Sequence, residues 1–138
     1  MECCPADIQK KLERWGLDAE ARKETIDRLY AERFIDEERY SRSFAHDKLR
    51  YNQWGRIKIA QSLRLKGIPE TACRAALDAL DEQEYNECLR KLLRNKSRQI
   101  KAESEYERNG KLIRFALSHG FEMSLITRCL HVEEKDYT

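Results

Sequence analysis

The chain has 138 residues, of which 38% are charged and 41% hydrophobic, with two Trp and a formal net charge of +2. A chain of this length buries a core without disulfides or metals, and the hydrophobic share excludes a disordered protein. No run approaches the roughly 20 apolar residues of a membrane span and no signal peptide precedes the domain, so a cytoplasmic location is expected.

The predicted secondary structure is helical almost throughout, because only five Gly and two Pro interrupt the hydrophobic spacing. In chain order, helices are predicted at about 6–15, 19–32, 36–51, 55–66, 69–80, 82–102, 106–119 and 122–131. The last residues, HVEEKDYT, form a short polar tail that is expected to be frayed. The predicted fold class is therefore all-α.

Three of these helices end in a similar way, on a glycine that an apolar residue follows. The glycines are Gly16, Gly67 and Gly120, which lie 51 and 53 residues apart. Each is expected to take the left-handed conformation that ends a helix. The residues four before and ten after the glycines are also apolar: Leu12, Leu63 and Ala116, then Ile26, Leu77 and Leu130. Of these, Leu12, Leu63 and Leu77 are predicted to be buried.

A period of about fifty residues indicates tandem repeats, each of which packs only on its neighbours. The chain is accordingly predicted to be a single domain, 1–138, made of tandem three-helix repeats in an elongated, curved array. The repeats extend over about 6–52, 55–103 and 106–132. The third is incomplete, because only two clear helices precede the tail.

The stretch LRLKGIPETACRAAL, residues 63–77, also fits a DNA-binding helix-turn-helix, whose second helix enters the major groove. Such a helix needs basic or amide side chains near its start to reach the base edges. Here the helix offers Arg74 as a single cation and continues into acidic Asp78, Asp81 and Glu82, which phosphates repel. The stretch is therefore interpreted as part of a repeat.

Charge is segregated along the chain despite the small net charge. Residues 39–66, the first basic band, hold 8 basic and 1 acidic side chains, whereas 67–89 hold 1 and 6. Residues 90–114, the second basic band, hold 9 and 3. Such bands are either solvated helix faces or a surface for docking onto a charged polymer, nucleic acid or protein filament. The candidate contact residues are Arg42, Lys48, Arg50, Arg56, Lys58, Arg64 and Lys66, followed by Arg94, Arg98 and Lys101.

No catalytic site is predicted. The histidines, His46, His119 and His131, are scattered, and neither a nucleophile motif nor a phosphate-binding glycine loop occurs. The five cysteines are odd in number and form no CxxC pair, which excludes a disulfide scaffold and leaves zinc without its usual ligand spacing. We therefore expect a protein that is no enzyme and that holds no metal or cofactor.

Residues 29–68, LYAERFIDEERYSRSFAHDKLRYNQWGRIKIAQSLRLKGI, resemble the signature of the RecX family, bacterial regulators of the recombinase RecA. The matching elements are the run from Phe34 to Tyr40, Phe44-Ala45, Trp54-Gly55, Lys58-Ile59, Leu63 and Lys66-Gly67-Ile68. KKLERWGL resembles the family's first repeat and KLIRFALSHGFEMSLITRCL its last. The resemblance implies three tandem three-helix repeats, in agreement with the glycine spacing, although the third unit is shorter here.

The resemblance also implies a function. RecX proteins bind the RecA–DNA filament and restrain its ATPase, strand exchange and growth in recombinational repair and the SOS response, so a mainly inhibitory modulator of RecA is expected. The alternative is a non-specific accessory protein that binds single- or double-stranded DNA without a dedicated protein partner. In either case we expect a monomer without a membrane partner. Reversing Arg50, Arg56 and Lys66 to Glu is expected to weaken binding and leave the fold intact.

Overall fold

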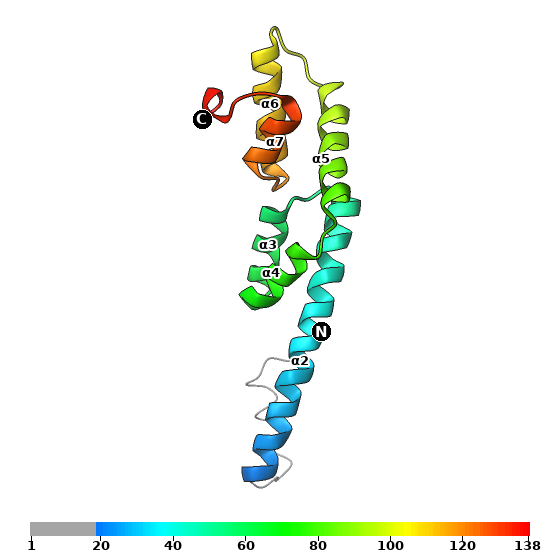
Figure 1. Cartoon of the computed structure of the whole chain (residues 1–138), viewed down its shortest axis with the longest axis vertical. Helices are drawn as coiled ribbons and strands as arrows, with labels where there is room; N and C mark the ends of the chain where they lie inside the picture. Colours follow the sequence, from blue (N-terminus) through cyan, green and yellow to red (C-terminus); the bar gives the residue numbers. More distant parts are fainter. Residues whose placement is uncertain (1–18) are drawn as a thin grey trace. The chain divides into compact units, whose positions relative to one another are not determined.

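The computed structural model describes residues 19–138, so the predicted first helix, Leu12 and Gly16 lie outside the described residues. Between residues 19 and 138 the protein is helical and contains no strand, which confirms the all-α prediction (Figure 1). The elements are α2 (Ala19–Asn52), α3 (Arg56–Leu65), α4 (Glu70–Asp78), α5 (Glu82–Ser97), α6 (Glu105–Ser118), α7 (Met123–Leu130) and a short 3-10 helix, η1 (Glu134–Asp136). None of these helices carries an apolar stretch long enough to span a bilayer.

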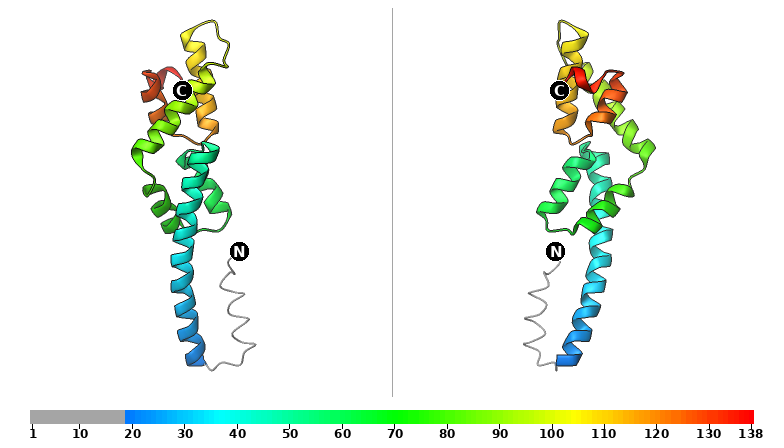
Figure 2. Two further views of the ribbon diagram at one scale, coloured as in Figure 1. Left: turned by 90° about the vertical axis from the view of Figure 1, so that its right-hand side faces the viewer. Right: turned by 60° about the vertical axis from the view of Figure 1, so that its left-hand side comes forward.

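The chain divides into two compact units, Met1–Tyr40 and Ser41–Thr138. In the second unit α3 packs on α4, and α5, α6 and α7 pack on one another, as the views in Figure 2 show. Every α-helix of the unit contributes side chains to its core, which is built from Ala45, Leu49, Ile59, Leu63, Cys73, Ala76, Tyr85, Leu89, Leu93, Leu112, Ile113, Ala116 and Ile126, with Phe121 from the α6–α7 turn.

Two glycines end helices in the same way, as predicted. Gly67 follows α3 with φ 80°, and Gly120 follows α6 with φ 91°. In each case the next residue returns its N–H to the helix: Ile68 donates to the Leu63 carbonyl at 3.1 Å, and Phe121 donates to the Ala116 carbonyl at 3.2 Å. This backbone pattern satisfies carbonyls that a helix end otherwise leaves without a partner.

The predicted core positions fall at different depths. Leu63 is fully buried, as predicted, and Phe121 is fully buried after its glycine. Leu77 is only half-buried and packs against the margin of the core. Ile26 is half-buried in the first unit.

Helix α2 is continuous, whereas the sequence predicted two helices, 19–32 and 36–51. The predicted helix 36–51 begins with an acidic run, Asp36 to Glu38, and the helix dipole favours carboxylates at a helix start. In the structure Glu37 lies inside the helix and pairs with Arg33 four residues earlier, with 2.8 Å between Nε and the carboxylate. No Gly or Pro lies between the two predicted helices, so nothing interrupts the backbone ladder.

The end of α5 and the tail also differ from the prediction. Helix α5 ends at Ser97, whose carbonyl accepts a hydrogen bond of 2.8 Å from Arg108, rather than near residue 102. The tail is not frayed, because Tyr137 stacks on Tyr106 with ring centroids 4.8 Å apart. The Tyr106 hydroxyl also donates to the Asp136 carbonyl at 2.8 Å. One aromatic side chain thus fixes a polar segment that has no helical pattern of its own.

Candidate interaction surface

Two arginines of the first basic band, Arg50 and Arg64, form bidentate pairs with carboxylates of other helices. Arg50 on α2 donates to Glu84 on α5 through Nε and Nη2, at 3.2 and 3.1 Å. Arg64 at the end of α3 holds Glu70 at the start of α4 in the same bidentate manner, at 2.9 and 2.8 Å. The hydrogen bond from Arg64 lowers the pKa of the Glu70 carboxyl. These guanidinium charges are therefore offset by neighbours within the fold.

The lysines of the same band gather on two aromatic rings. The Nζ of Lys48 lies 4.8 Å from the centre of the Trp54 ring and 5.5 Å from that of Phe44. Lys58 lies over Trp54 at 4.8 Å, and Lys66 lies over Phe44 at 5.5 Å. The two rings meet edge to face, with centroids 6.5 Å apart. We call these five residues the lysine–aromatic cluster.

The positive charge of this cluster is not balanced inside the fold. Among residues 19–138 no carboxylate forms an ion pair with Lys48, Lys58 or Lys66. Contacts with the rings hold the ammonium groups in place, each with about 0.5–1 kcal/mol, but do not neutralise them. Three like charges on half-exposed rings create a local positive potential that attracts carboxylates or phosphates.

Arg56 differs from the other cations because it joins three helices. Its guanidinium lies 3.9 Å from the Tyr85 ring centre, 2.8 Å from Glu122 and 2.6 Å from Glu82. Tyr85 accepts a hydrogen bond of 2.9 Å from the backbone N–H of Arg56, and its hydroxyl donates to Glu122. Since only 20% of the Arg56 side chain is exposed, we now expect its reversal to Glu to cost stability, whereas the sequence led us to expect an intact fold.

Tyr85 should resist ionisation in the native protein. Burial raises the pKa of its hydroxyl, and the hydrogen bond to Glu122 raises this pKa further. The neutral phenol therefore contributes stability that is complete below the ordinary tyrosine pKa of about 10 and is lost as pH rises towards the raised value. In an absorbance titration, we expect the folded parent and the Tyr85→Phe variant to gain the same phenolate signal, and the parent to gain one more phenolate only on alkaline unfolding. A larger signal from the folded parent would contradict this expectation.

The start of α3 is docked on the end of α6. Gly55 donates its N–H to the His119 carbonyl at 2.7 Å, and Ile57 donates to the Gly120 carbonyl at 3.0 Å. A Cβ at Gly55 would lie 2.4 Å from the Gly120 oxygen, and a Cβ at Gly120 would lie 2.3 Å from the Cβ of Lys58. We call this contact the α3–α6 junction. It fixes the backbone of Lys58, a member of the cluster, and the sequence does not predict this role for Gly55.

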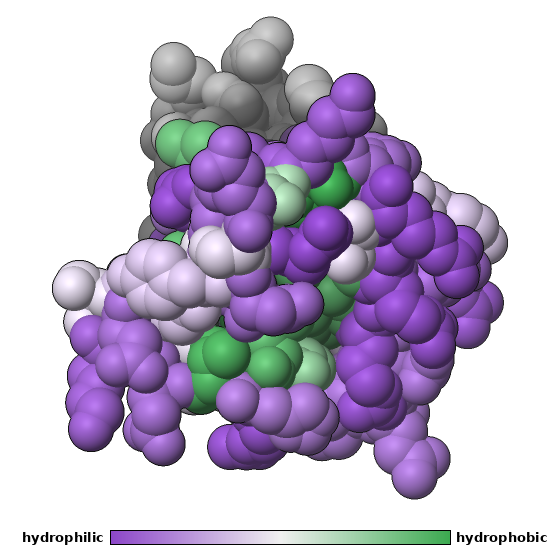
Figure 3. Space-filling model, turned by 90° about the horizontal axis from the view of Figure 1, so that it is seen from above, coloured by the Kyte–Doolittle hydropathy of each residue, from purple (hydrophilic) through white to green (hydrophobic). Residues whose placement is uncertain are grey.

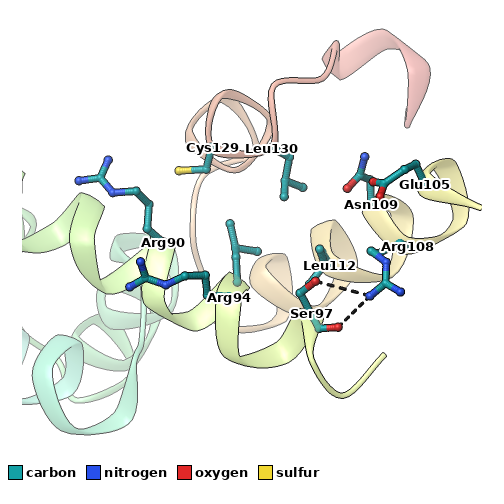
Figure 4. Close-up of a pocket in the computed structure, with 10 residues that line it drawn as sticks. Arg90, Arg94, Ser97, Glu105, Arg108, Asn109, Leu112, Cys129 and Leu130 are labelled. Atoms are coloured by element: carbon teal, nitrogen blue, oxygen red, sulfur yellow. Dashed lines mark hydrogen bonds between the residues drawn. The ribbon is translucent and has the colours of Figure 1, made fainter. Parts of the chain in front are cut away.

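Candidates of the second basic band are dispersed. Arg94 lies on α5 beside Arg90, and both face Glu87, at 3.5 and 3.3 Å. They line a pocket of about 350 Å³ whose floor includes leucines of α5, α6 and α7 (Figure 4). Figure 3, viewed from the side of the loop that joins α5 to α6, shows hydrophobic residues framed by hydrophilic ones.

The remaining candidates do not line this pocket. Arg98 and Lys101 are exposed beyond the end of α5, and Arg42 is exposed on α2. Of the candidates in the first basic band, Lys48, Lys58 and Lys66 meet on the same two rings.

The cysteines and histidines between residues 19 and 138 do not form a reactive or metal-binding site. Burial raises the pKa of the Cys73, Cys88 and Cys129 thiols. His119 lies with Nδ1 2.8 Å from the Gln53 carbonyl, next to the α3–α6 junction. Between residues 19 and 138 no group of three metal-ligating side chains occurs.

Short helices that end on a left-handed glycine, arranged in successive groups of three, define a tandem helical-repeat protein. The model of the RecX second three-helix domain matches residues 36–77, and that of the RecX third three-helix domain matches residues 82–130. Among relatives named Regulatory protein RecX, one from Clostridium botulinum (strain Alaska E43 / Type E3) is 33% identical, with 86% of this chain and 56% of the relative covered. One from Chlorobium limicola (strain DSM 245 / NBRC 103803 / 6330) is 30% identical, with 87% and 74% covered.

A solved structure agrees with these sequence matches. The crystal structure of regulatory protein RecX has a TM-score of 0.66 and 24% identity, and the likeness covers 95% of this chain and 64% of that one. The chain belongs to the RecX family.

The chain spans 56% of the length of the Clostridium botulinum relative. The boundary between the two matched domains falls after α4. The second RecX domain holds the later part of α2 with α3 and α4, and the third holds α5, α6 and α7. The glycine spacing places the repeats at about 6–52, 55–103 and 106–132 instead, so it divides the helices at other points. These boundaries stay a prediction.

Proposed function

We propose that the chain modulates RecA, mainly as an inhibitor, by binding the RecA–DNA filament and restraining its ATPase, strand exchange and growth in recombinational repair and the SOS response. The observation that carries the proposal is the lysine–aromatic cluster, whose three ammonium groups have no carboxylate partner among residues 19–138. The relatives of this chain are named regulatory proteins, and we propose no catalytic role for it.

A filament is a suitable target for such a surface. It presents the same protein surface and the same phosphates at every protomer, so weak contacts from one chain add through effective concentration. The second basic band, with Arg94, Arg98 and Lys101, is proposed as a further contact region, since these cations are exposed.

The alternative function, non-specific DNA binding, is favoured by the same cluster, because lysines and aromatic rings together suit single-stranded nucleic acid. The two functions differ when DNA is in excess. We would measure RecA-catalysed ATP hydrolysis on single-stranded DNA with increasing amounts of this protein, and repeat the titration with a large excess of the same DNA. A filament regulator still inhibits there, whereas a protein that binds only DNA is drawn away by the free strands and inhibition disappears.

Reversal of the lysines tests the site itself. The Lys48→Glu, Lys58→Glu, Lys66→Glu variant should keep its helical content, because surface substitutions usually change stability by about 0.5 kcal/mol each. Its inhibition of the RecA ATPase should fall by about tenfold or more, and the salt dependence of the remaining binding should weaken, because the lost contacts are electrostatic.

A matched control carries the same change in net charge elsewhere. Arg74, Arg128 and Lys135 are exposed cations outside both basic bands, and their reversal to Glu should leave inhibition near that of the parent. If both triple variants lose inhibition equally, net charge rather than the cluster governs binding. If the cluster variant folds and inhibits like the parent, the cluster is a solvated face.

A further inference from the structure

Helix α3 exposes an apolar row on the side away from the core. Ile59, Ala60 and Leu63 are buried. Ile57, Gln61 and Leu65 follow one another at intervals of four, so they share a face that turns away from these residues. Ile57 is 46% exposed and Leu65 is 90% exposed, the largest exposure among the big hydrophobic side chains of residues 19–138. We call Ile57, Gln61 and Leu65 the outer row.

The two flanks of the outer row differ in charge. Lys58 and Lys66 directly follow the two apolar residues, about 100° further round the helix, and belong to the lysine–aromatic cluster. Arg64 flanks the row on its other side, where Glu70 offsets its charge. The row is thus bordered by unbalanced positive charge along one side only.

A protein surface fits this arrangement better than nucleic acid does. A helix that reads base edges relies on basic or amide side chains along the face that enters the groove, and the outer row offers only Gln61. Phosphates and sugars give an exposed leucine little apolar surface to contact. A leucine and an isoleucine two turns apart are instead suited to an apolar strip, as in the recognition of one protein helix by another protein.

We propose that the outer row is the surface through which this chain contacts protein, and that its occupant is a protein surface with an apolar strip bordered on one side by carboxylates. The proposal rests on the proposed function, in which the protein partner is the RecA filament. It separates two roles: the lysines of the cluster attract any anionic partner, and the outer row on α3 discriminates protein from DNA alone.

The experiment compares Leu65→Ser with the parent chain on two targets, RecA filaments on single-stranded DNA and the same DNA without RecA. Because a buried apolar anchor near the centre of an interface contributes much of its affinity, the dissociation constant for filaments should rise by about tenfold or more. The dissociation constant for DNA alone should not change. Leu117→Ser, a matched loss of a leucine that is 42% exposed on α6, should leave both constants unchanged.

Each other result has a defined meaning. Unchanged filament binding by a folded Leu65→Ser variant overturns the inference, and so does an equal loss with Leu117→Ser. A loss of binding to DNA alone assigns the row to nucleic acid. If sedimentation shows a parent dimer that Leu65→Ser dissociates, the row holds a second copy of this chain instead. A parent chain that does not bind the filament overturns the proposed function, and this inference with it.

Discussion

Replacing Gly55 with alanine should destabilise the second unit by about 3 kcal/mol or more, an effect comparable to that of overpacking a core. The added Cβ would lie 2.4 Å from the Gly120 oxygen and 2.5 Å from the Phe121 nitrogen. Both are backbone atoms, so relief requires α3 to move away from α6 and to lose the hydrogen bonds of the α3–α6 junction. Gly55 has φ −84° and ψ 174°, which any residue adopts, so the cost comes from the contact alone.

Gly67→Ala is the matched control, because its situation is the reverse. Gly67 has φ 80°, but a Cβ there would meet no atom within 4 Å. Only backbone strain is added, which costs about 1–2 kcal/mol. Urea denaturation followed by circular dichroism measures both free energies of unfolding. A cost for Gly67→Ala equal to or above that of Gly55→Ala would show that the α3–α6 junction yields easily.

The second large effect is expected from Arg56→Glu, which should lower the free energy of unfolding by about 3–5 kcal/mol. The change removes the ion pairs with Glu82 and Glu122 and the guanidinium that lies over the Tyr85 ring. It also places a third carboxylate between the two that remain. Repulsion among them acts at the point where α3, α5 and the start of α7 meet.

Arg64→Glu provides the comparison on the same helix. Arg64 also forms a bidentate pair with a glutamate, but 53% of each side chain is exposed. Water screens such pairs, so the reversal should lower the free energy of unfolding far less than Arg56→Glu does. Thermal or urea unfolding of the two variants would show whether burial decides the value of these arginines. Equal costs would mean that Arg56 is no more than a surface cation.

The parts of the fold that the sequence predicts are those set by local backbone chemistry. Gly67 and Gly120 were identified because a helix that ends in the left-handed region favours glycine, whatever surrounds it. Burial of Leu63 follows from its place on the apolar face of α3. The break predicted within α2 was wrong because an acidic run is stabilised either at a helix start or by ion pairs inside a helix. The pair between Arg33 and Glu37 is of the second kind.

The candidate surface was predicted in composition and not in arrangement. Charge counting finds all cations of the first basic band, but it does not show that Arg50 and Arg56 meet carboxylates of α5, which follow by 34 and 26 residues. Nor does it place Lys66 over Phe44. These ion pairs and ring contacts depend on which helices lie side by side. That arrangement is determined by how the apolar side chains of the whole unit are buried, which charge counting does not include.

The α3–α6 junction has a consequence for cooperativity. Gly55 belongs to the stretch that matches the second RecX domain, and Gly120 belongs to the third. The first amides of α3 are therefore capped by carbonyls of the other domain, and the helix dipoles of α6 and α3 meet negative end to positive end. Unfolding of either domain leaves backbone groups of the other without hydrogen-bond partners. The two domains should therefore unfold in one cooperative transition, and a displacement of one should be transmitted to the other.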